Sequence, residues 1–543
     1  MPAEPPLKVH QAIARALAAN GVDTIFGLVG DANMFMIDSF VRDCGGCFVA
    51  AGHEAGAAFM AIGYAALAGR IGVCSVTHGP GMVNTATALV HGVRASVPML
   101  LLCGDTQDIG HSQHVAQRGF AIAAGAGFEQ LRSPRTVAQD VARALHRAIA
   151  ERRPIALDVP DHLDWQEAQD FRPIVARIPE SRAVVAASED LDNAIGIIAA
   201  AKRPLVLAGR GAAGPAARQA ILKLAARIEA PLATTLKAKD LFRGEDCDLG
   251  LFGTLSAPAA VETIMESDCL IAFGASLNDK TMSNGAFRKG KRIVQVNLEP
   301  AEIGKHFLPD AGVVGDPAGV AELFHHWLDE AEIPASGFRG EALRERLAAD
   351  GQAAGVDSDG AYEEALRRLE EILPEDRVLV TDAGRFVVKV WTRMRVRGPD
   401  SFLSTVDFGS IGLGLAHAIG AAHAAPGRPV VLLSGDGGFM HGGLAEFNTA
   451  VRHGADLVVV ICNDRAYGAE VEKYRRRYPD GAMDPGLIAF DWPDFATVAT
   501  ALGGEGLAIR ADTDWTAAAE AIRKRTRPLL IDVRLDLLRA ARA

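Results

Sequence analysis

The sequence predicts an α/β fold built from several mainly parallel sheets, each flanked by helices. Short apolar runs rich in β-branched residues, such as VVLL (430–433), LVVVIC (457–462) and PLVLA (204–208), are each followed within two residues by Gly, Asp or Asn. Amphipathic stretches of helical length separate these runs, and this alternation favours parallel strands joined by helical crossovers. With 543 residues, 49% of them hydrophobic, the chain is long enough for several domains with large cores.

Changes in composition divide the chain into three such domains. The first ends after the apolar strand PIALDVP (154–160) and is followed by a linker of mixed polarity. The second begins at a helix expected over residues 190–200 and ends before PASGFRG (334–340). A charged helix within 361–377 leads into the third. We therefore expect domains over residues 5–175, 188–335 and 360–543, each with a mainly parallel sheet.

Charge and composition argue against several kinds of partner. The chain has 56 Lys and Arg against 67 Asp and Glu, and its compact basic cluster, Arg475-Arg476-Arg477, is typical of a solvated loop face. We therefore expect no nucleic-acid partner. The N-terminus lacks an apolar signal core, and no uncharged apolar run reaches about 18 residues, so we expect a cytoplasmic protein without membrane association. Cys44 and Cys47 have redox or metal spacing without a second pair, and we interpret them as ordinary reduced thiols.

The most informative pattern joins two strands of the third domain. One strand ends at Gly435-Asp436-Gly437, and the next ends at Asn463, after 26 intervening residues (437–462). Open α/β sheets bind ligands at the carboxyl ends of their strands. An aspartate, an asparagine and the carbonyl of Arg465 would supply oxygen ligands of the kind Mg²⁺ prefers, and the glycines would let a diphosphate approach the backbone. A plain strand–turn–helix signal is the alternative for GDG alone.

Three further segments accompany this pattern. Residues 408–414 are rich in glycine and present Ile411 as a bulky apolar side chain before a helix of small residues. Glu54 opens an apolar helix, where a carboxylate is costly to bury unless something needs it. Residues 77–84 run from a strand end into another helix. Each segment alone has a structural alternative: a packed helix entry, a favourable first-turn charge or a plain turn.

Together, the four segments resemble the thiamine diphosphate enzymes of the acetolactate synthase, pyruvate decarboxylase and benzoylformate decarboxylase superfamily. The GDG…N pattern matches that family's cofactor-anchoring motif. HEAGAA (53–58) is similar to its glutamate helix, and THGPGMVN (77–84) to its TSGPGxxN segment. LIAFGASLNDKT (270–281) and VNLEPAEIGK (296–305) in the middle domain also look like this group, so the resemblance covers nearly the whole chain.

The resemblance implies a pyrimidine-binding first domain, a central domain and a third domain that binds diphosphate and Mg²⁺. It implies an active site shared between chains, and therefore a homodimer at least, with a homotetramer as the expected assembly. Glu54 would hydrogen-bond ring nitrogen N1′ of the cofactor, Ile411 would support its bent conformation, and the Gly409 carbonyl would receive the 4′-amino group. The cofactor-binding positions implied are Glu54, Pro80, Asn84, Gly384, Gly409, Ile411, Gly435, Asp436, Gly437, Gly438, Asn463, Tyr467 and Gly468, and the metal ligands are Asp436, Asn463 and Arg465.

The reaction implied is the making or breaking of a carbon–carbon bond next to a carbonyl, through a thiamine-bound carbanion. The enzyme would be a lyase or transferase, a carboligase similar to acetolactate synthase, acting on a 2-oxo acid or 2-hydroxyketone with an aldehyde or ketone as acceptor. The alternative is a 2-oxo acid decarboxylase that releases an aldehyde. A non-catalytic relative is disfavoured because Glu54 and the metal ligands are all present. The candidate catalytic residues are Glu54, Asp31, His111, His114, Gln117 and Glu470.

These residues match two subfamilies only in part. FGLVGD (26–31) resembles the FGVPGD segment of decarboxylases, but His111 and His114 replace their adjacent histidine pair, and Glu470 is offset by one position. Gln117 is what remains of the Phe-Gln-Glu segment of acetolactate synthases, whose Trp-Gln pair is missing here. A housekeeping acetolactate synthase is therefore not favoured.

Several features have no assigned role. His78 and His441 lie next to two of the motifs without a clear function. Gly209–Gly214 lacks the spacing of a dinucleotide-binding loop, and a structural FAD or a nucleotide in the central domain stays open. Residues 470–490 are rich in charge, Pro and Gly, and we expect a mobile segment that orders over the site when cofactor or substrate binds.

Overall fold

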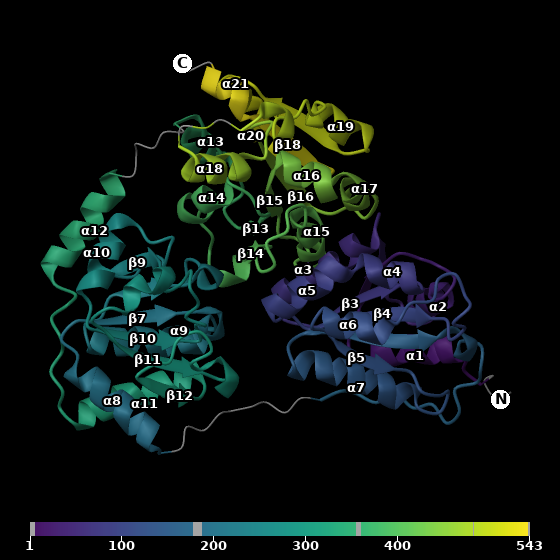
Figure 1. Ribbon diagram of the computed structural model, residues 1–543, viewed down its shortest axis with the longest axis horizontal. Helices are drawn as coiled ribbons and strands as arrows, with labels where there is room; N and C mark the ends of the chain where they lie inside the picture. Colours follow the sequence, from purple (N-terminus) through teal and green to yellow (C-terminus); the bar gives the residue numbers. More distant parts are fainter. Residues whose placement is uncertain (1–5, 178–186, 354–359, 480, 482, 541–543) are drawn as a thin grey trace. The chain divides into compact units, whose positions relative to one another are not determined.

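The computed structural model describes residues 6–177, 187–353, 360–479, 481 and 483–540 (Figure 1). Two compact units are present, one within residues 1–179, 368–387 and 403–543 and the other within 180–367 and 388–402. The described residues contain three six-stranded parallel sheets, which confirms the predicted fold class. The first unit holds the N-terminal sheet (β1–β6) and the C-terminal sheet (β13–β18), and the second holds the central sheet (β7–β12). The predicted domain boundaries remain a proposal.

The N-terminal sheet has the strand order β2-β1-β3-β4-β6-β5. Its buried strands β3 and β4 carry nearly continuous apolar sequences, as expected for strands covered by helices on both faces. The strands are β1 (Thr24–Gly27), β2 (Cys47–Ala50), β3 (Gly72–Val76), β4 (Met99–Asp105), β5 (Gly127–Gln130) and β6 (Pro154–Pro160). The helices are α1 (Val9–Ala19), α2 (Met34–Arg42), α3 (Glu54–Ala68), α4 (Gly79–Asn84), α5 (Ala86–Ala95), α6 (Gln117–Ala123) and α7 (Val137–Ala150).

The central sheet has the order β12-β11-β10-β7-β8-β9. Gly209 and Gly211, after β7, pack against the backbone of Gly274, since a Cβ at Gly209 would lie 2.3 Å from the Gly274 carbonyl oxygen. Close packing thus explains why glycine occupies positions 209 and 211, without invoking a nucleotide-binding role. The strands are β7 (Pro204–Ala208), β8 (Leu232–Thr234), β9 (Asp248–Leu251), β10 (Cys269–Phe273), β11 (Arg292–Asn297) and β12 (Ala311–Val314). The helices are α8 (Glu189–Ala200), α9 (Pro215–Arg227), α10 (Pro258–Glu266), α11 (Pro317–Glu330) and α12 (Glu341–Ala353).

The C-terminal sheet has the order β14-β13-β15-β16-β18-β17. Every residue of β16 is buried, so this strand lies at the centre of the core. The strands are β13 (Val378–Thr381), β14 (Phe402–Ser404), β15 (Val430–Gly435), β16 (Leu457–Asn463), β17 (Glu505–Ile509) and β18 (Leu529–Arg534). The helices are α13 (Gly360–Ile372), α14 (Val387–Arg393), α15 (Gly414–Ala424), α16 (Asp436–Gly442), α17 (Leu444–Arg452), α18 (Gly468–Arg477), α19 (Phe495–Ala501), α20 (Asp514–Lys524) and α21 (Leu535–Ala540).

Helices α3 and α15 join the two sheets of the first unit into one hydrophobic core. Their small residues allow the backbones to approach closely. A Cβ at Gly63 would lie 2.4 Å from the His417 carbonyl oxygen, and one at Gly420 would lie 2.0 Å from that of Met60. Any larger residue at either glycine would push the helices apart. The close contact fixes α3, whose first residue is Glu54. Among the described residues, no helix is both long and apolar enough to cross a membrane.

Candidate functional site

Asp436 and Asn463 lie side by side at the carboxyl edge of the C-terminal sheet. Gly435 of β15 pairs in register with Cys462 of β16, and the two polar residues each come one position later. Both side chains are only 2% exposed. The structure therefore brings together the two residues that the sequence suggested as metal ligands.

Hydrogen bonds orient both side chains. The Asn463 amide nitrogen donates to Asp532 Oδ1 (2.9 Å), so its carbonyl oxygen points the other way, where it accepts from the Arg465 N–H (3.2 Å). The Trp492 indole N–H donates to Asp436 Oδ2 (2.8 Å). Sequence reasoning did not identify Asp532 or Trp492, because both lie far from the GDG…N pattern along the chain.

The carbonyl of Arg465 was the third candidate ligand. Arg465 has a left-handed backbone conformation (φ 59°), and its carbonyl oxygen accepts the Phe490 N–H (2.9 Å). A carbonyl oxygen has two lone pairs, so one is still available to a cation. Its role as a ligand stays a proposal.

The electrostatics of this edge suit a cation. Burial, and secondarily the charge of Asp464, raise the pKa of Asp436 to about 7. Asp464 is itself paired with Arg385 (2.5 Å). A bound divalent ion would favour the ionised carboxylate, and an aspartate with two carbonyl-type oxygens is the hard donor set that Mg²⁺ accepts. Across the described parts of the chain, no group of three or more His, Cys, Asp and Glu could hold a metal; Cys44 and Cys47 are free.

Glycines allow the chain to pack closely around this edge. A Cβ at Gly437 would lie 2.4 Å from Cε1 of Tyr467, and Gly412 has φ +84° with a hypothetical Cβ 3.0 Å from the Gly438 carbonyl oxygen. The buried Asp382 holds the loop, because it accepts from the Gly412 N–H (3.0 Å) and the Ser434 hydroxyl (3.1 Å). Sequence reasoning missed Asp382, although this residue directly follows an apolar strand, β13, and begins the segment DAG (382–384).

The remaining positions of this half follow the same edge. Gly384 has φ +156°, Gly409 is exposed with φ +85°, and Ile411 after it is half-buried. The exposed His441 lies beside Gly412, whose hypothetical Cβ would be 3.0 Å from the His441 ring carbon Cδ2. At Gly409 no atom lies within 4 Å of a hypothetical Cβ, so a ring could reach the backbone there.

Glu54 is the first residue of α3 and is 8% exposed. Its Oε2 accepts a hydrogen bond from the Asn84 amide at the end of α4 (3.0 Å). The structure thus brings together two of the predicted cofactor-binding residues, while Pro80 is exposed in the first turn of α4.

Glu446 of α17 holds the turn that precedes Glu54. Its carboxylate accepts the Gly52 N–H (3.1 Å) and the His53 N–H (3.0 Å), and a Cβ at Gly56 would lie 2.1 Å from its Oε1. Burial raises the pKa of Glu446. Sequence reasoning did not identify Glu446, although an acidic residue on the inner face of an amphipathic helix needs a partner.

His78, which had no assigned role, lies at the centre of a polar group at the N-terminal sheet. Its Nδ1 is 3.1 Å from Gln113 Oε1 and 3.4 Å from Asp31 Oδ1, and its Nε2 is 3.6 Å from Asp161 Oδ2. Asp31 also accepts from the Thr77 hydroxyl (2.9 Å), and this hydrogen bond lowers the pKa of Asp31.

The two predicted histidines differ in their surroundings. The ring of His111 lies 5.9 Å from the ring of His78, measured between centroids, so His111 borders the polar group. His114 instead has its Nδ1 3.2 Å from the Thr106 carbonyl oxygen.

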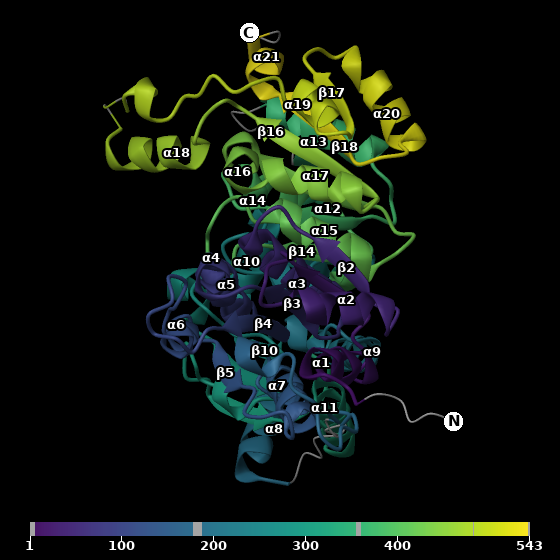
Figure 2. The same cartoon turned by 90° about the vertical axis from the view of Figure 1, so that its right-hand side faces the viewer.

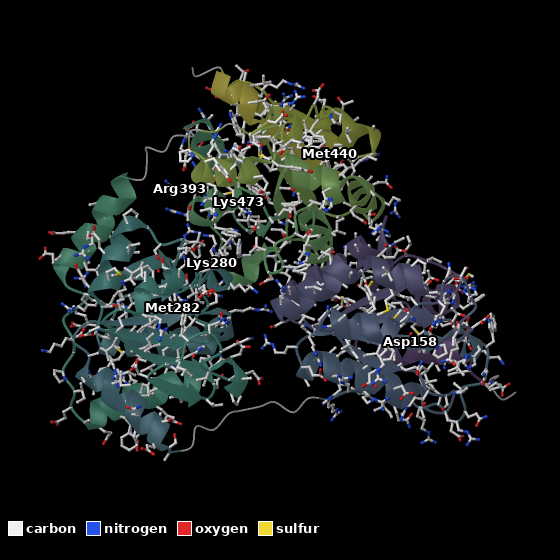
Figure 3. All side chains as sticks on the ribbon, viewed as in Figure 1. Asp158, Lys280, Met282, Arg393, Met440 and Lys473 are labelled. Atoms are coloured by element: carbon white, nitrogen blue, oxygen red, sulfur yellow. The ribbon has the colours of Figure 1, made fainter. Side chains whose placement is uncertain are left out.

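Gln117 is buried at the first turn of α6, next to a carboxyl pair. Its amide nitrogen donates to the Gly104 carbonyl (2.8 Å) and to Asp158 Oδ1 (2.6 Å), whereas its Oε1 has no hydrogen-bond partner among the described residues. The side chain of Asp158 is labelled in Figure 3. Burial and the neighbouring Asp105 raise its pKa to about 8. Gln117 therefore offers a buried acceptor oxygen held in one orientation.

Glu470 lies on α18, a helix without a buried residue that stands away from the strands of the C-terminal sheet (Figure 2). Its carboxylate is 4.0 Å from the Lys473 ammonium, an exposed pair. Gly468 begins this helix beside Arg385 and Asp464. The structure thus gives the predicted mobile segment a helix, Gly468–Arg477, whereas its ordering on binding stays a prediction.

Comparisons with known proteins agree over all three domains. Family models of thiamine pyrophosphate enzymes match three parts of the chain. They are the N-terminal TPP binding domain at residues 7–124, the central domain at 191–323 and the C-terminal TPP binding domain at 382–533. A probable 2-ketoarginine decarboxylase of Pseudomonas aeruginosa is 30% identical over 92% of this chain and 88% of its own length. The sulfoacetaldehyde acetyltransferase of Alcaligenes xylosoxydans xylosoxydans is 28% identical over 92% and 87%. The acetolactate synthase large subunit of Parasynechococcus marenigrum is 29% identical over 92% and 82%.

Proposed function

Because this chain belongs to the thiamine pyrophosphate (thiamine diphosphate) enzymes, we propose that it is a carboligase or carbon–carbon lyase that acts on a 2-oxo acid or a 2-hydroxyketone. The observation that carries this proposal is the pair Asp436 and Asn463, whose buried side chains lie at adjacent strand ends. They would bind the Mg²⁺ of the cofactor diphosphate, with the Arg465 carbonyl as a third ligand. When bound, thiamine diphosphate supplies an electron sink for cleavage of the bond next to a carbonyl.

The candidate residues at the N-terminal sheet would orient the cofactor and hold or transfer protons. Glu54 would hold a proton at the cofactor pyrimidine, and its hydrogen bond from Asn84 would keep its carboxylate in place. Gly409 and Ile411 would contact the same ring system from the C-terminal sheet. In the proposed homodimer, or a tetramer built from it, these two sets would meet across the interface between chains. The proposed location is the cytoplasm.

Two observations bear on the fate of the donor substrate. Glu470 lies on an exposed helix and pairs with Lys473, so the decarboxylase set predicted from the sequence is incomplete. This supports transfer of the acyl unit to an aldehyde or ketone. The second candidate, a decarboxylase that releases an aldehyde, is favoured by the contact between Asp31 and His78, which could deliver a proton.

A single-turnover assay separates these candidates. Protein loaded with thiamine diphosphate and Mg²⁺ is mixed with a panel of 2-oxo acids, with and without an added aldehyde, and CO₂ and products are followed by mass. CO₂ with a 2-hydroxyketone product is the result expected for a carboligase. CO₂ with free aldehyde would establish the decarboxylase instead. An absence of CO₂ from every acid would exclude 2-oxo acid donors and point to a hydroxyketone lyase.

A further inference from the structure

Trp492 connects the candidate metal site to the segment that follows it in the chain. Its indole N–H donates to one carboxylate oxygen of Asp436, Oδ2, at 2.8 Å. The same ring stacks on Phe490, with centroids 4.5 Å apart and planes 18° apart, and Phe490 meets the edge of Tyr467 at 4.6 Å. We name these three residues, Tyr467, Phe490 and Trp492, the aromatic clamp.

The clamp closes around the GDG turn. Tyr467 packs so tightly on Gly437 that a Cβ there would lie 2.4 Å from its ring, while Trp492 reaches the neighbouring Asp436. The two ends of the clamp thus rest on consecutive residues of the turn. Only a glycine at position 437 leaves room for the tyrosine ring.

Backbone hydrogen bonds hold the two chain segments of the aromatic clamp together. The Tyr467 N–H donates to the Ile488 carbonyl (3.0 Å), and the Phe490 N–H donates to the Arg465 carbonyl (2.9 Å), around an antiparallel bridge between Ala466 and Ala489. The Arg465 side chain also donates to the Phe490 carbonyl (3.2 Å). The chain therefore returns to the sheet edge beside the point at which it left.

Each of the three candidate ligand oxygen groups is thus held by a donor from this paired segment. Trp492 holds Asp436, the Arg465 N–H holds Asn463, and the Phe490 N–H holds the Arg465 carbonyl. Hydrogen bonds to metal-ligating carboxylates orient the ligands, and their removal typically weakens metal binding by about 10–100-fold. The indole donor is the one that a substitution can remove without changing the backbone.

We infer that Trp492 is a positioning residue: its N–H fixes one oxygen of Asp436 and leaves the other to the cation, while the aromatic clamp ties this orientation to the segment after Asn463. This inference rests on the proposed cation site. It goes beyond the proposed function because it assigns the site a residue outside the GDG…N pattern.

The test uses Mn²⁺ as the probe, in the full-length protein with thiamine diphosphate at a fixed concentration. Loss of the free-ion electron paramagnetic resonance signal reports binding. Trp492→Phe keeps an aromatic ring that can stack on Phe490 but removes the N–H, and we expect the Mn²⁺ dissociation constant to rise about tenfold or more. Trp515→Phe, a buried tryptophan on α20, is the matched control and should bind as the wild type does.

A merely structural role would give a different pattern. It would lower the melting temperature of the cation-free protein while leaving Mn²⁺ affinity unchanged, and that result would overturn the inference. Tighter binding by Trp492→Phe would do so as well, since it would show that the indole competes with the cation. Should Trp492→Phe not fold, Phe490→Leu removes the stack and keeps the N–H, and unchanged affinity in that variant would exclude the clamp. Failure of the wild type to bind Mn²⁺ would instead refute the cation site itself.

Discussion

The carboxyl edges of the N-terminal and C-terminal sheets both carry polar candidate residues, but they hold them differently. At the C-terminal sheet, Asp436 and Asn463 are neighbours in register, and each has its own hydrogen-bond partner. At the N-terminal sheet, the candidates fall into separate groups. Glu54 pairs with Asn84, whereas Gln117 pairs with Asp158.

The difference follows from how each edge is built. Two adjacent strand ends bring Asp436 and Asn463 together, so a short pattern contains the position of this pair. At the N-terminal edge, loops and helices from distant parts of the chain supply the side chains, and the partner of a residue is decided by packing. The C-terminal edge should therefore lose its function through single ligands, and the N-terminal edge through the residues that hold its groups together.

The largest effect is expected at Glu54. Glu54→Gln keeps the size of the side chain and its contact with Asn84 but removes the acid, so kcat should fall by roughly 10²–10⁴-fold, the range of a general acid–base contribution. Steady-state kinetics with saturating thiamine diphosphate measure it. A kcat within a few-fold of wild type would remove Glu54 from the catalytic set.

The next effect concerns the cation ligands. Asp436→Asn removes the carboxylate, and Mg²⁺ affinity should fall by about 100-fold or more, since a neutral amide cannot replace the charge. Asp464→Asn is the matched control: this neighbouring carboxylate is paired with Arg385, so its loss should matter far less. Equal losses in both variants would mean that general negative charge, and not ligation by Asp436, holds the cation.

Glu446 tests whether the turn before Glu54 is held from α17. Glu446→Gln leaves one of the two N–H groups of Gly52 and His53 without an acceptor, which should cost about 1–3 kcal/mol of stability. Urea unfolding measures the loss. Glu520→Gln, an exposed residue of α20, should change stability by no more than about 0.5 kcal/mol. Similar values for the two variants would contradict the role of Glu446.

Much of the fold and half of the site could be predicted from the sequence. The alternation of apolar strands and amphipathic helices is a local pattern, and so is GDG…N. Asp382, Glu446 and Trp492 were missed because their contacts join segments far apart in the chain. His78 was recognised as lying in a motif, but its contacts Asp31, Gln113 and Asp161 come from three separate segments of the chain.

The histidines give a smaller contrast within the N-terminal edge. His78 is buried among Asp31, Gln113 and Asp161, whereas His111 only borders this group. His78→Ala should lower kcat/KM by about tenfold, equivalent to ~1.4 kcal/mol or one charge-assisted hydrogen bond. His111→Ala should change it by less than about threefold. The reverse order would support His111, one of the two histidines predicted from the sequence.

The last comparison concerns the pH dependence of stability contributed by Asp158. Its pKa is about 8 in the folded protein against 3.8 as the ordinary value, so between these pH values the folded state binds more protons than the unfolded state. Stability should therefore fall as the pH rises towards 8, by at most about 1.4 kcal/mol per pH unit, and level off above it. Melting temperatures from pH 6 to 9 measure this. Asp158→Asn should flatten the dependence of melting temperature on pH. An unchanged dependence would mean that another group binds the proton.

Calorimetric titration of thiamine diphosphate into the cation-free protein, with Mg²⁺ or with a chelator, is the decisive test of the cation site. We expect the cofactor to bind only with Mg²⁺ and to lose this binding in Asp436→Asn. Binding of equal strength in the presence of the chelator, or no binding with Mg²⁺ present, would contradict this expectation.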